Sequence, residues 1–264
     1  MDFTGKRVLV VGTGVSGIAA IRLLAAKGAK PVVLEGNEKA DREQVVSRIP
    51  EGIGYDLIIG NLPEEVMDTL DLAVLSPGVP TDLPFVIKLQ DKKIPVWGEI
   101  ELAYACGSGR LAAITGTNGK TTTTALTGAI LREYYDSVYV VGNIGLPYTE
   151  YALEMKDSSV TVAEVSSFQL ETIHTFQPEV SAILNITPDH LNRHHTMECY
   201  IDTKARIAEN QTKAQICVLN YEDEHLQKLA AKIPADIFWF SSKRPLERGI
   251  WLDGEDIIYK DGEE

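Results

Sequence analysis

The sequence predicts an α/β protein: a Rossmann-like amino-terminal domain, then a P-loop-type ATPase domain with a parallel sheet and a small antiparallel hairpin near its carboxyl end. Three observations favour this fold. Short apolar runs alternate with helical patterns, as in βαβ units. Two glycine-rich loops each follow a predicted strand and precede a predicted helix. The length of 264 residues also suffices for two cores of roughly 100 to 150 residues each.

The first series of apolar runs predicts the sheet of the amino-terminal domain. Its buried strands are expected at Arg7–Val11, Pro31–Glu35, Leu57–Ile59 and Leu72–Leu75. The pattern from Ile18 to Ala26 predicts a helix that ends at Gly28. We place the domain boundary near Trp97, which gives domains 1–97 and 98–264.

A helix is predicted at Glu99–Ala105, and a second parallel sheet is predicted after the small-residue stretch Cys106–Arg110. Its strands are expected at Leu111–Thr115, Val138–Val141, Val160–Val165, Val180–Ile186 and Ile216–Leu219. Near the carboxyl end, Asp253 and Gly254 separate the runs Ile250–Leu252 and Asp256–Tyr259. An Asp-Gly pair between two strand-like runs indicates a two-residue hairpin.

The composition excludes several classes of partner. A formal charge of -13 argues against a surface for nucleic acid or anionic membranes, because a negative field repels phosphate polymers. No stretch approaches the roughly 18 apolar residues of a membrane span, and Met1 leads directly into a strand-like run without a cleavable signal. Cys106, Cys199 and Cys217 show no CxxC spacing. We therefore expect a cytoplasmic monomer without disulfides or a zinc site.

The first glycine loop has the form of a phosphate-binding turn. Gly12, Gly14 and Gly17 follow a strand and open a helix, so backbone N–H groups can face a phosphate at the positive helix end. Glu35 closes the next strand, where a carboxylate can accept ribose hydroxyls, and Gly78 follows a further strand. A nicotinamide dehydrogenase would have the same pattern. The glycines alone can also serve tight strand-to-helix packing.

The second glycine loop is more specific. Gly116 and Gly119 let backbone N–H groups face phosphates, Lys120 can neutralise the β and γ groups, and the Thr121 hydroxyl can bind Mg²⁺. A standard GxxxxGK[ST] loop has glycine where this chain has Ile114, so the loop is a shortened variant. The predicted ATP-binding residues are Gly116, Thr117, Asn118, Gly119, Lys120, Thr121 and Thr122.

Two side chains at strand ends complete the predicted site. Glu164 ends an apolar strand, where a carboxylate can reach a metal on the nucleotide phosphates. His190 follows the next strand, in the segment NITPDH. Its alternative role is that of a surface or packing residue. The remaining histidines carry no comparable argument; they are His174, His194, His195 and His225.

Five segments together resemble the Mur ligases. GTGVSG, ITGTNGKTTTT, GNIGLP, EVSSFQLE and NITPDHLNRH occur in this order and at similar spacings, over essentially all 264 residues. GNIGLP and EVSSFQLE are most similar to the members that add D-glutamate to UDP-N-acetylmuramoyl-L-alanine. The resemblance implies that the first domain holds the UDP part of the substrate and the second holds ATP. A third domain of the family helps to position ATP and the amino acid, and we expect it to lie outside this sequence.

The resemblance also implies residue roles. Lys120 would bind the γ-phosphate, Thr121 and Glu164 would hold one Mg²⁺, and His190 would hold a second. The implied substrate-binding residues are Gly14, Val15, Ser16, Glu35, Gly78 and Asn143. The family often has aspartate at position 35, and glutamate also presents a carboxylate.

Lys204 is a fourth implied catalytic and metal-binding residue, beside Lys120, Glu164 and His190. The family carries a carbamylated lysine, and the spacing from Tyr200 to Lys204 matches it. A carbamate turns a cation into an anionic oxygen ligand, which suits Mg²⁺. The alternative is an unmodified, solvated helix lysine.

The implied reaction phosphorylates the carboxylate of UDP-N-acetylmuramoyl-L-alanine with ATP, and D-glutamate attacks the acyl phosphate to form an amide. Three other functions remain open at this point. A sister ligase that adds L-alanine has a similar first domain. A P-loop regulatory NTPase would normally carry an NKxD-like motif, which we do not find. A nicotinamide oxidoreductase would leave Lys120 and Glu164 unexplained.

Overall fold

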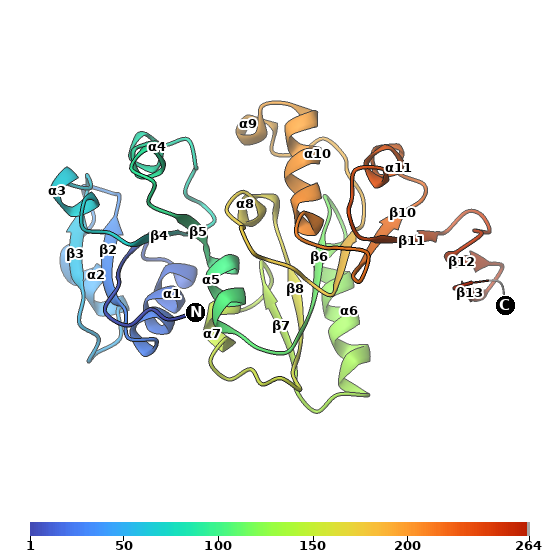
Figure 1. The fold of residues 1–264 in the computed structure, drawn as a ribbon, viewed down its shortest axis with the longest axis horizontal. Helices are drawn as coiled ribbons and strands as arrows, with labels where there is room; N and C mark the ends of the chain where they lie inside the picture. Colours follow the sequence, from blue (N-terminus) through green and yellow to red (C-terminus); the bar gives the residue numbers. More distant parts are fainter. Residues whose placement is uncertain (263–264) are drawn as a thin grey trace. The chain divides into compact units, whose positions relative to one another are not determined.

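The computed structural model describes residues 1–262 and confirms the predicted α/β class. Packing divides the chain into two compact units, which are described separately here (Figure 1). Unit 1 comprises Met1–Ser108, Gly145–Lys156 and Glu171–Thr175. Unit 2 comprises Gly109–Ile144, Asp157–Leu170 and the chain from Phe176 onward. The functional domains predicted at 1–97 and 98–264 stay a prediction.

Unit 1 is built on a parallel sheet with the strand order β3-β2-β1-β4-β5. Its strands are β1 (Arg7–Val11), β2 (Lys30–Glu35), β3 (Asp56–Ile59), β4 (Leu72–Leu75) and β5 (Val96–Gly98). Its helices are α1 (Val15–Ala26), α2 (Arg42–Arg48), α3 (Glu64–Met67), α4 (Pro84–Asp91), α5 (Glu99–Cys106) and α7 (Tyr148–Tyr151). The strand order reverses between β1 and β4, and ligands of such sheets bind beyond the carboxyl ends at this point.

The two central strands of unit 1 explain the continuous apolar runs of the sequence. Leu9 and Val10 of β1 and Val74 of β4 are almost fully buried. Strands covered on both faces read as unbroken apolar runs, because neither face meets water. The predicted strands Arg7–Val11 and Leu72–Leu75 are confirmed at both ends.

Two buried carboxylates of α5 hold distant chain segments in unit 1. Glu99 accepts hydrogen bonds from the backbone N and Oγ1 of Thr149, at 2.7 and 2.9 Å. Glu101 accepts from the backbone N atoms of His174 and Thr175, at 2.9 and 2.7 Å. A buried carboxylate is stable only when hydrogen bonds replace its lost hydration. These two residues therefore fix where both segments pack.

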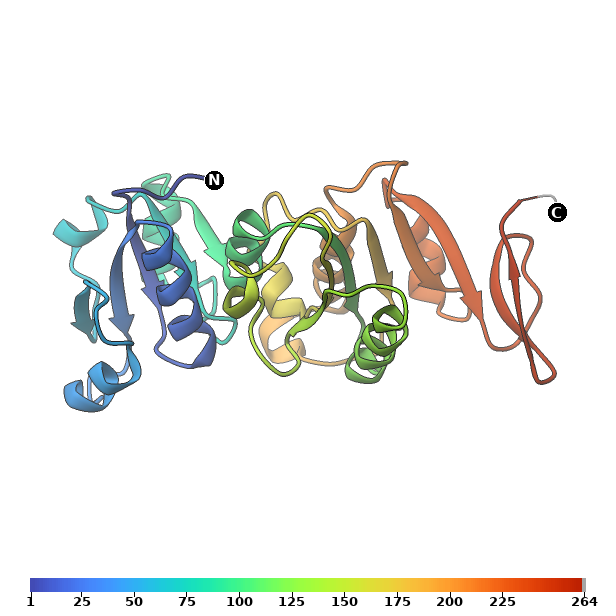
Figure 2. The ribbon, with the colours of Figure 1, turned by 90° about the horizontal axis from the view of Figure 1, so that it is seen from below.

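Unit 2 is built on an eight-stranded sheet with the order β13-β12-β11-β10-β9-β6-β8-β7 (Figure 2). Its strands are β6 (Arg110–Thr115), β7 (Val138–Gly142), β8 (Val160–Glu164), β9 (Val180–Ile183), β10 (Ile216–Asn220), β11 (Asp236–Ser241), β12 (Gly249–Asp253) and β13 (Asp256–Lys260). Its α-helices are α6 (Lys120–Arg132), α8 (Ser167–Leu170), α9 (Leu191–His194), α10 (Met197–Ala205) and α11 (Glu224–Ala230), and a 3₁₀ turn covers Arg206–Ala208. Only β12 and β13 pair antiparallel among the described strands, which confirms the predicted hairpin.

The structure corrects some predicted boundaries. The strand expected at Val180–Ile186 ends at Ile183, because the chain beyond it turns to the loop after β6. There the backbone O of Asn185 accepts a hydrogen bond from the N of Thr117. The strand expected to end at Val165 ends at Glu164. Strands β5 and β11 were not predicted.

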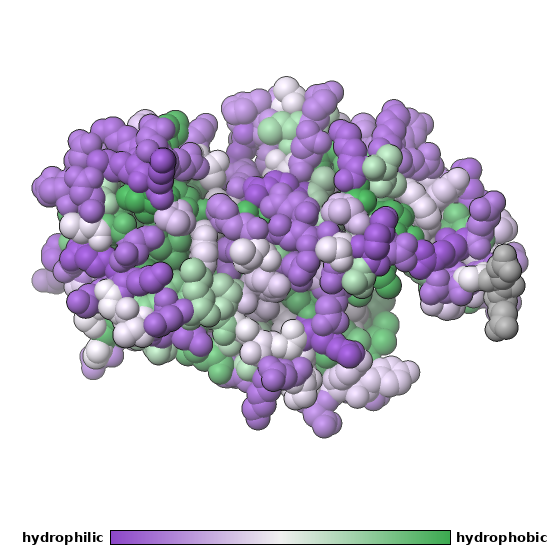
Figure 3. Space-filling view, viewed as in Figure 1, coloured by the Kyte–Doolittle hydropathy of each residue, from purple (hydrophilic) through white to green (hydrophobic). Residues whose placement is uncertain are grey.

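Hydrophilic and apolar residues alternate over the visible surface (Figure 3). Hydrophilic side chains cover most of the face shown in Figure 3, with smaller apolar areas between them. Within the described residues, no helix combines the length and apolar character needed to cross a membrane.

Candidate active site

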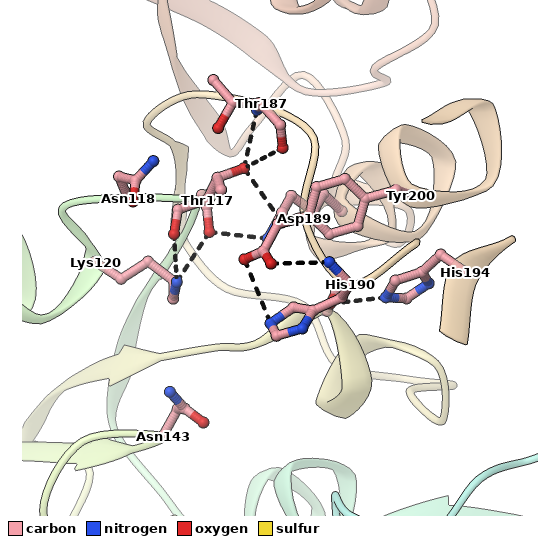
Figure 4. Close-up of polar contacts among 12 residues, drawn as sticks. Thr117, Asn118, Lys120, Asn143, Thr187, Asp189, His190, His194 and Tyr200 are labelled. Atoms are coloured by element: carbon pink, nitrogen blue, oxygen red, sulfur yellow. Dashed lines mark hydrogen bonds and ion pairs between the residues drawn. The ribbon is translucent and has the colours of Figure 1, made fainter. Parts of the chain in front are cut away.

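The second glycine loop joins β6 to α6 in unit 2, and all seven predicted ATP-binding residues lie in it or in the first turn of α6. Gly119 precedes α6 with φ +82°, a left-handed conformation that favours glycine. Lys120 folds back over the loop: its Nζ donates to the backbone O of Gly116 and of Thr117, at 3.1 and 2.9 Å (Figure 4). The loop thus gathers a cation and a helix N-terminus, which together favour phosphate.

Glu164 ends β8, next to β6 in the sheet. Its side chain is buried, and Oε1 accepts a hydrogen bond of 2.7 Å from Nδ2 of Asn143. Oε2 is also buried and has no hydrogen-bond partner among the described residues. A buried carboxylate oxygen without a partner is costly, and a bound cation is one way to satisfy it.

Lys204 is buried, so the alternative of a solvated helix lysine is wrong. Only 2% of the residue is exposed. Its Nζ donates to the backbone O of Gly116 at 2.9 Å and to Oγ1 of Thr115 at 3.4 Å. Burial, followed by the charge of Lys120, lowers the pKa of Lys204 to about 7, while Asp189 opposes this shift. The burial arises because α10 packs against the second glycine loop, which we call the phosphate loop from here on. No local sequence pattern indicates this packing.

His190 lies in the loop between β9 and α9, with φ +52°. Its ring packs on Phe168, with the ring centroids 4.9 Å apart. Its Nε2 lies 3.5 Å from Oδ2 of Asp189, and Figure 4 shows the two side chains together. The structure therefore places His190 beside a carboxylate and an aromatic ring that the sequence analysis did not single out.

Tyr200 and Asn185 are further residues that sequence reasoning missed. Tyr200 is buried; its hydroxyl lies 3.2 Å from Oγ1 of Thr117, and its ring centroid lies 4.8 Å from Nζ of Lys204. Asn185 hydrogen-bonds the backbone of Asn118. A polar residue directly after an apolar strand, as Asn185 is, was the available signal. Tyr200 entered the sequence analysis only through its spacing from Lys204, without a role of its own.

The predicted substrate residues of unit 1 do not all share one pocket. Glu35 and Gly78 line a pocket of about 690 Å³ beyond the carboxyl ends of the strands. Gly14 and Val15 line a second pocket of about 450 Å³. Ser16 lies in the first turn of α1 and lines neither of these two pockets.

The carboxylate of Glu35 is held in place within unit 1. Its Oε2 accepts a hydrogen bond from Oγ1 of Thr13, and its Oε1 accepts one of 3.1 Å from the backbone N of Asn37. A carboxylate oxygen has room for more than one hydrogen bond. Glu35 can therefore still accept a bond from a ligand hydroxyl in the larger pocket.

Two family models together span most of the chain. The model "Mur ligase MurD-like, N-terminal domain" matches residues 6–98, and "Mur ligase middle domain" matches residues 114–262. The chain belongs to the Mur ligase family. The sequence-based resemblance is thereby confirmed.

Curated relatives of this Mur ligase chain are named UDP-N-acetylmuramoylalanine--D-glutamate ligase. The protein from Lachnoclostridium phytofermentans is 57% identical over 100% of this chain, and that from Lachnospira eligens is 55% identical over 99%. The protein from Clostridioides difficile is 46% identical over 98%. The chain spans 57 to 58% of the length of these relatives.

Solved structures support the fold. The crystal structure of UDP-N-acetylmuramate:L-alanyl-gamma-D-glutamyl-meso-diaminopimelate ligase from Neisseria meningitides has a TM-score of 0.62 at 14% identity, covering 97% of this chain and 85% of that one. The crystal structure of UDP-N-acetylmuramate-alanine ligase from Thermotoga maritima has a TM-score of 0.52 at 21% identity, covering 90% of this chain and 53% of that one.

The glycine loop of this Mur ligase chain gives a stability prediction. A Cβ on Gly17 would lie 1.9 Å from the backbone O of Gly12, whereas a Cβ on Gly14 would meet nothing within 4 Å. We expect Gly17→Ala to lower the free energy of unfolding by about 2 to 4 kcal/mol, because α1 must move away from β1. Gly14→Ala should change it by less than about 1 kcal/mol. Chemical denaturation of both variants measures the difference; equal stabilities would contradict the tight packing of Gly17 on Gly12.

Proposed function

We propose that this chain carries the UDP-sugar-binding and ATP-binding parts of a ligase that adds D-glutamate to UDP-N-acetylmuramoyl-L-alanine, in peptidoglycan precursor synthesis. The observation that carries the proposal is its likeness to relatives named for this reaction, which extends over the whole chain at up to 57% identity. The phosphate loop of unit 2 and the pocket at the strand ends of unit 1 support it. A ligase that adds L-alanine is the alternative.

The larger pocket of unit 1 is the proposed site for the UDP part of the substrate. Its volume of about 690 Å³ falls within the range of about 300 to 1,000 Å³ that is typical of small-molecule sites. Glu35 can accept ribose hydroxyls there, and the amide N–H groups at the start of α1 can bind phosphate. We keep Gly14, Val15 and Ser16 as proposed phosphate contacts. Asn143 stays a proposed substrate contact.

ATP is the proposed co-substrate of unit 2. Lys120 would exchange its two backbone carbonyl contacts for the β- and γ-phosphates, which bind an ammonium more strongly because they are charged. The N–H groups from Gly119 to Thr122 would cradle the same phosphates, because those of Thr117 and Asn118 already donate to Asn185. Aligning the γ-phosphoryl group with the substrate carboxylate would then give an acyl phosphate, and the amine of D-glutamate would displace phosphate to form the amide. No side-chain nucleophile is required.

Two Mg²⁺ ions are proposed with the nucleotide, and the residues present fit at least one of them. The buried, unpartnered Oε2 of Glu164 is the observation that fits a cation. Thr121 and Glu164 would hold one ion, and His190 and carbamylated Lys204 would hold the other. Bound Mg²⁺ would neutralise charge on the phosphates. Mg²⁺ prefers oxygen ligands, so His190 suits it less well than the other three residues.

Carbamylation of Lys204 is proposed as well, because it would turn the lysine into a metal ligand. Only a neutral amine adds CO₂. With a pKa of about 7, Lys204 would be about nine-tenths neutral at pH 8, whereas an ordinary lysine is almost wholly protonated at this pH. The proposed carbamate would place anionic oxygen near the phosphate loop, since the amine already lies 2.9 Å from the backbone O of Gly116.

We expect a carbamate signal in ¹³C NMR spectra when the protein is given ¹³C-bicarbonate at pH 8. The signal should weaken as the pH falls through about 7, because protonation removes the reactive amine. Lys204→Met is the matched control and should lack the signal. Identical spectra from the two proteins would remove Lys204 from the proposed metal site.

Phosphate release separates the candidate functions. A version of the protein extended by the carboxyl-terminal remainder of a curated relative is given ATP, one UDP-sugar acceptor and one amino acid. We expect release only with UDP-N-acetylmuramoyl-L-alanine and D-glutamate together. Release with UDP-N-acetylmuramate and L-alanine would favour the sister ligase. The monomeric state and the cytoplasmic location stay predictions, and light scattering measures the first.

A further inference from the structure

The segment that follows β9 lies alongside the phosphate loop, and Asn185 makes the central contact between them. The backbone N of Asn118 donates to Oδ1 of Asn185 at 2.8 Å. In return, Nδ2 of Asn185 donates to the backbone O of Asn118 at 2.9 Å. One carboxamide thus pairs with both polar backbone groups of a single residue, as a neighbouring strand would do.

Further contacts continue on either side of this pair. The backbone N of Thr117 donates to the O of Asn185 at 2.9 Å. The hydroxyl of Thr117 accepts from the backbone N of Thr187 at 3.0 Å and donates to its O at 3.2 Å, as Figure 4 shows for Thr117 and Thr187. At Gly116, an added Cβ would lie only 3.1 Å from Cβ of Leu184. Residues 184–187 therefore line residues 116–118 along their length.

We propose that Asn185 is a positioning residue for nucleotide binding, whose carboxamide holds the backbone of Asn118 in place so that the N–H groups that follow, from Gly119 to Thr122, face the phosphates. The inference rests on the proposed ATP site and names a residue outside the Gly-Lys-Thr loop that shapes it. Donors that are already oriented lose little conformational entropy when the ligand binds, so they bind it more tightly. Without the carboxamide, the loop must be ordered at the moment of binding.

The proposal predicts a loss of affinity only for ligands that carry phosphates. We expect Asn185→Ala to lower the affinity for ATP and ADP by about tenfold or more, because two hydrogen bonds that shape the loop are lost. Its affinity for adenosine should stay within about twofold of wild type, because adenosine has no phosphate to meet the loop. A purely structural role would weaken all three ligands alike.

The test is calorimetric titration of the folded 264-residue chain with ATP, ADP and adenosine, after thermal melts have fixed a temperature at which each variant is folded. Gln215→Ala is the matched control, because Gln215 also accepts a backbone hydrogen bond, from Thr212 at 2.8 Å, but away from the loop. If Asn185→Ala does not fold, Asn185→Ser keeps a polar side chain that is too short for both bonds, and the same selective loss is expected.

Each outcome decides one question. If wild type fails to bind ATP, the proposed nucleotide site is wrong. If wild type binds ATP and the Asn185 variant binds it equally well, the positioning role of Asn185 is overturned while the nucleotide site stands. Equal losses for adenosine and ATP also overturn the positioning role.

Discussion

We expect Lys120→Ala to lower the affinity of the 264-residue chain for ATP by about 100-fold or more, which corresponds to about 3 kcal/mol. The ammonium of Lys120 is the cation that the phosphate loop holds over its own carbonyl groups, at 3.1 Å from Gly116 and 2.9 Å from Thr117. Its removal deletes a charge-assisted contact to the β- and γ-phosphates while the glycines that shape the loop remain. Calorimetric titration with MgATP measures the loss.

The matched control for this prediction is Lys213→Ala. Lys213 also donates to a backbone carbonyl of unit 2, that of Ala235 at 2.7 Å, but it lies outside the phosphate loop. We expect its ATP affinity to stay within about twofold of wild type. Both variants should melt close to wild type, because each loses only one or two hydrogen bonds to backbone carbonyl groups. An unchanged affinity of Lys120→Ala would show that this loop does not bind the nucleotide.

The second large effect concerns the part of the curated relatives that this chain does not span. The chain spans 58% of the Lachnoclostridium phytofermentans relative. We expect a fusion of residues 1–264 to the carboxyl-terminal remainder of that relative to release phosphate on the order of a thousand times faster than the 264-residue chain alone, with D-glutamate and UDP-N-acetylmuramoyl-L-alanine present. Positioning of reactants is worth roughly 7 to 11 kcal/mol of barrier, and half of that already gives this factor.

The fusion carries its own controls. Lys120→Ala in the fusion should remove the turnover, which ties it to the phosphate loop of this chain. Omitting D-glutamate should do the same, which ties phosphate release to amide formation. Equal turnover by the fusion and the 264-residue chain would mean that the remainder of the relatives is not needed to position the reactants.

The sequence predicts the fold wherever burial is local. Strand β4, with its continuous run from Leu72 to Leu75, is predicted to the residue because both of its faces are covered. Strand β5 has only three residues, too few for a periodic pattern. The placement of the segments around Thr149 and Thr175 depends on Glu99 and Glu101, which are distant in sequence. No local pattern carries that information.

In the candidate site, too, residues that are neighbours in sequence are predicted, and residues that come from distant segments are not. The loop between β6 and α6 lies where the sequence predicts it, because its glycines and Lys120 stand close together in sequence. Its binding of ATP stays a prediction. Lys204 is identified by resemblance only, and its burial depends on how α10 packs against the loop. Asn185 was missed because its contact with the backbone of Asn118 joins two segments that are distant in sequence, although a polar residue after an apolar strand was an available signal.

The central claim is that unit 1 binds the UDP-linked substrate of a D-glutamate-adding Mur ligase. Titration of the 264-residue chain with UDP-N-acetylmuramoyl-L-alanine in a calorimeter tests it most directly. We expect saturable binding of one molecule per chain, weakened by Glu35→Ala because the carboxylate in the pocket of about 690 Å³ is lost. The absence of saturable binding by the folded chain, or equal binding by the Glu35→Ala variant, would contradict the account.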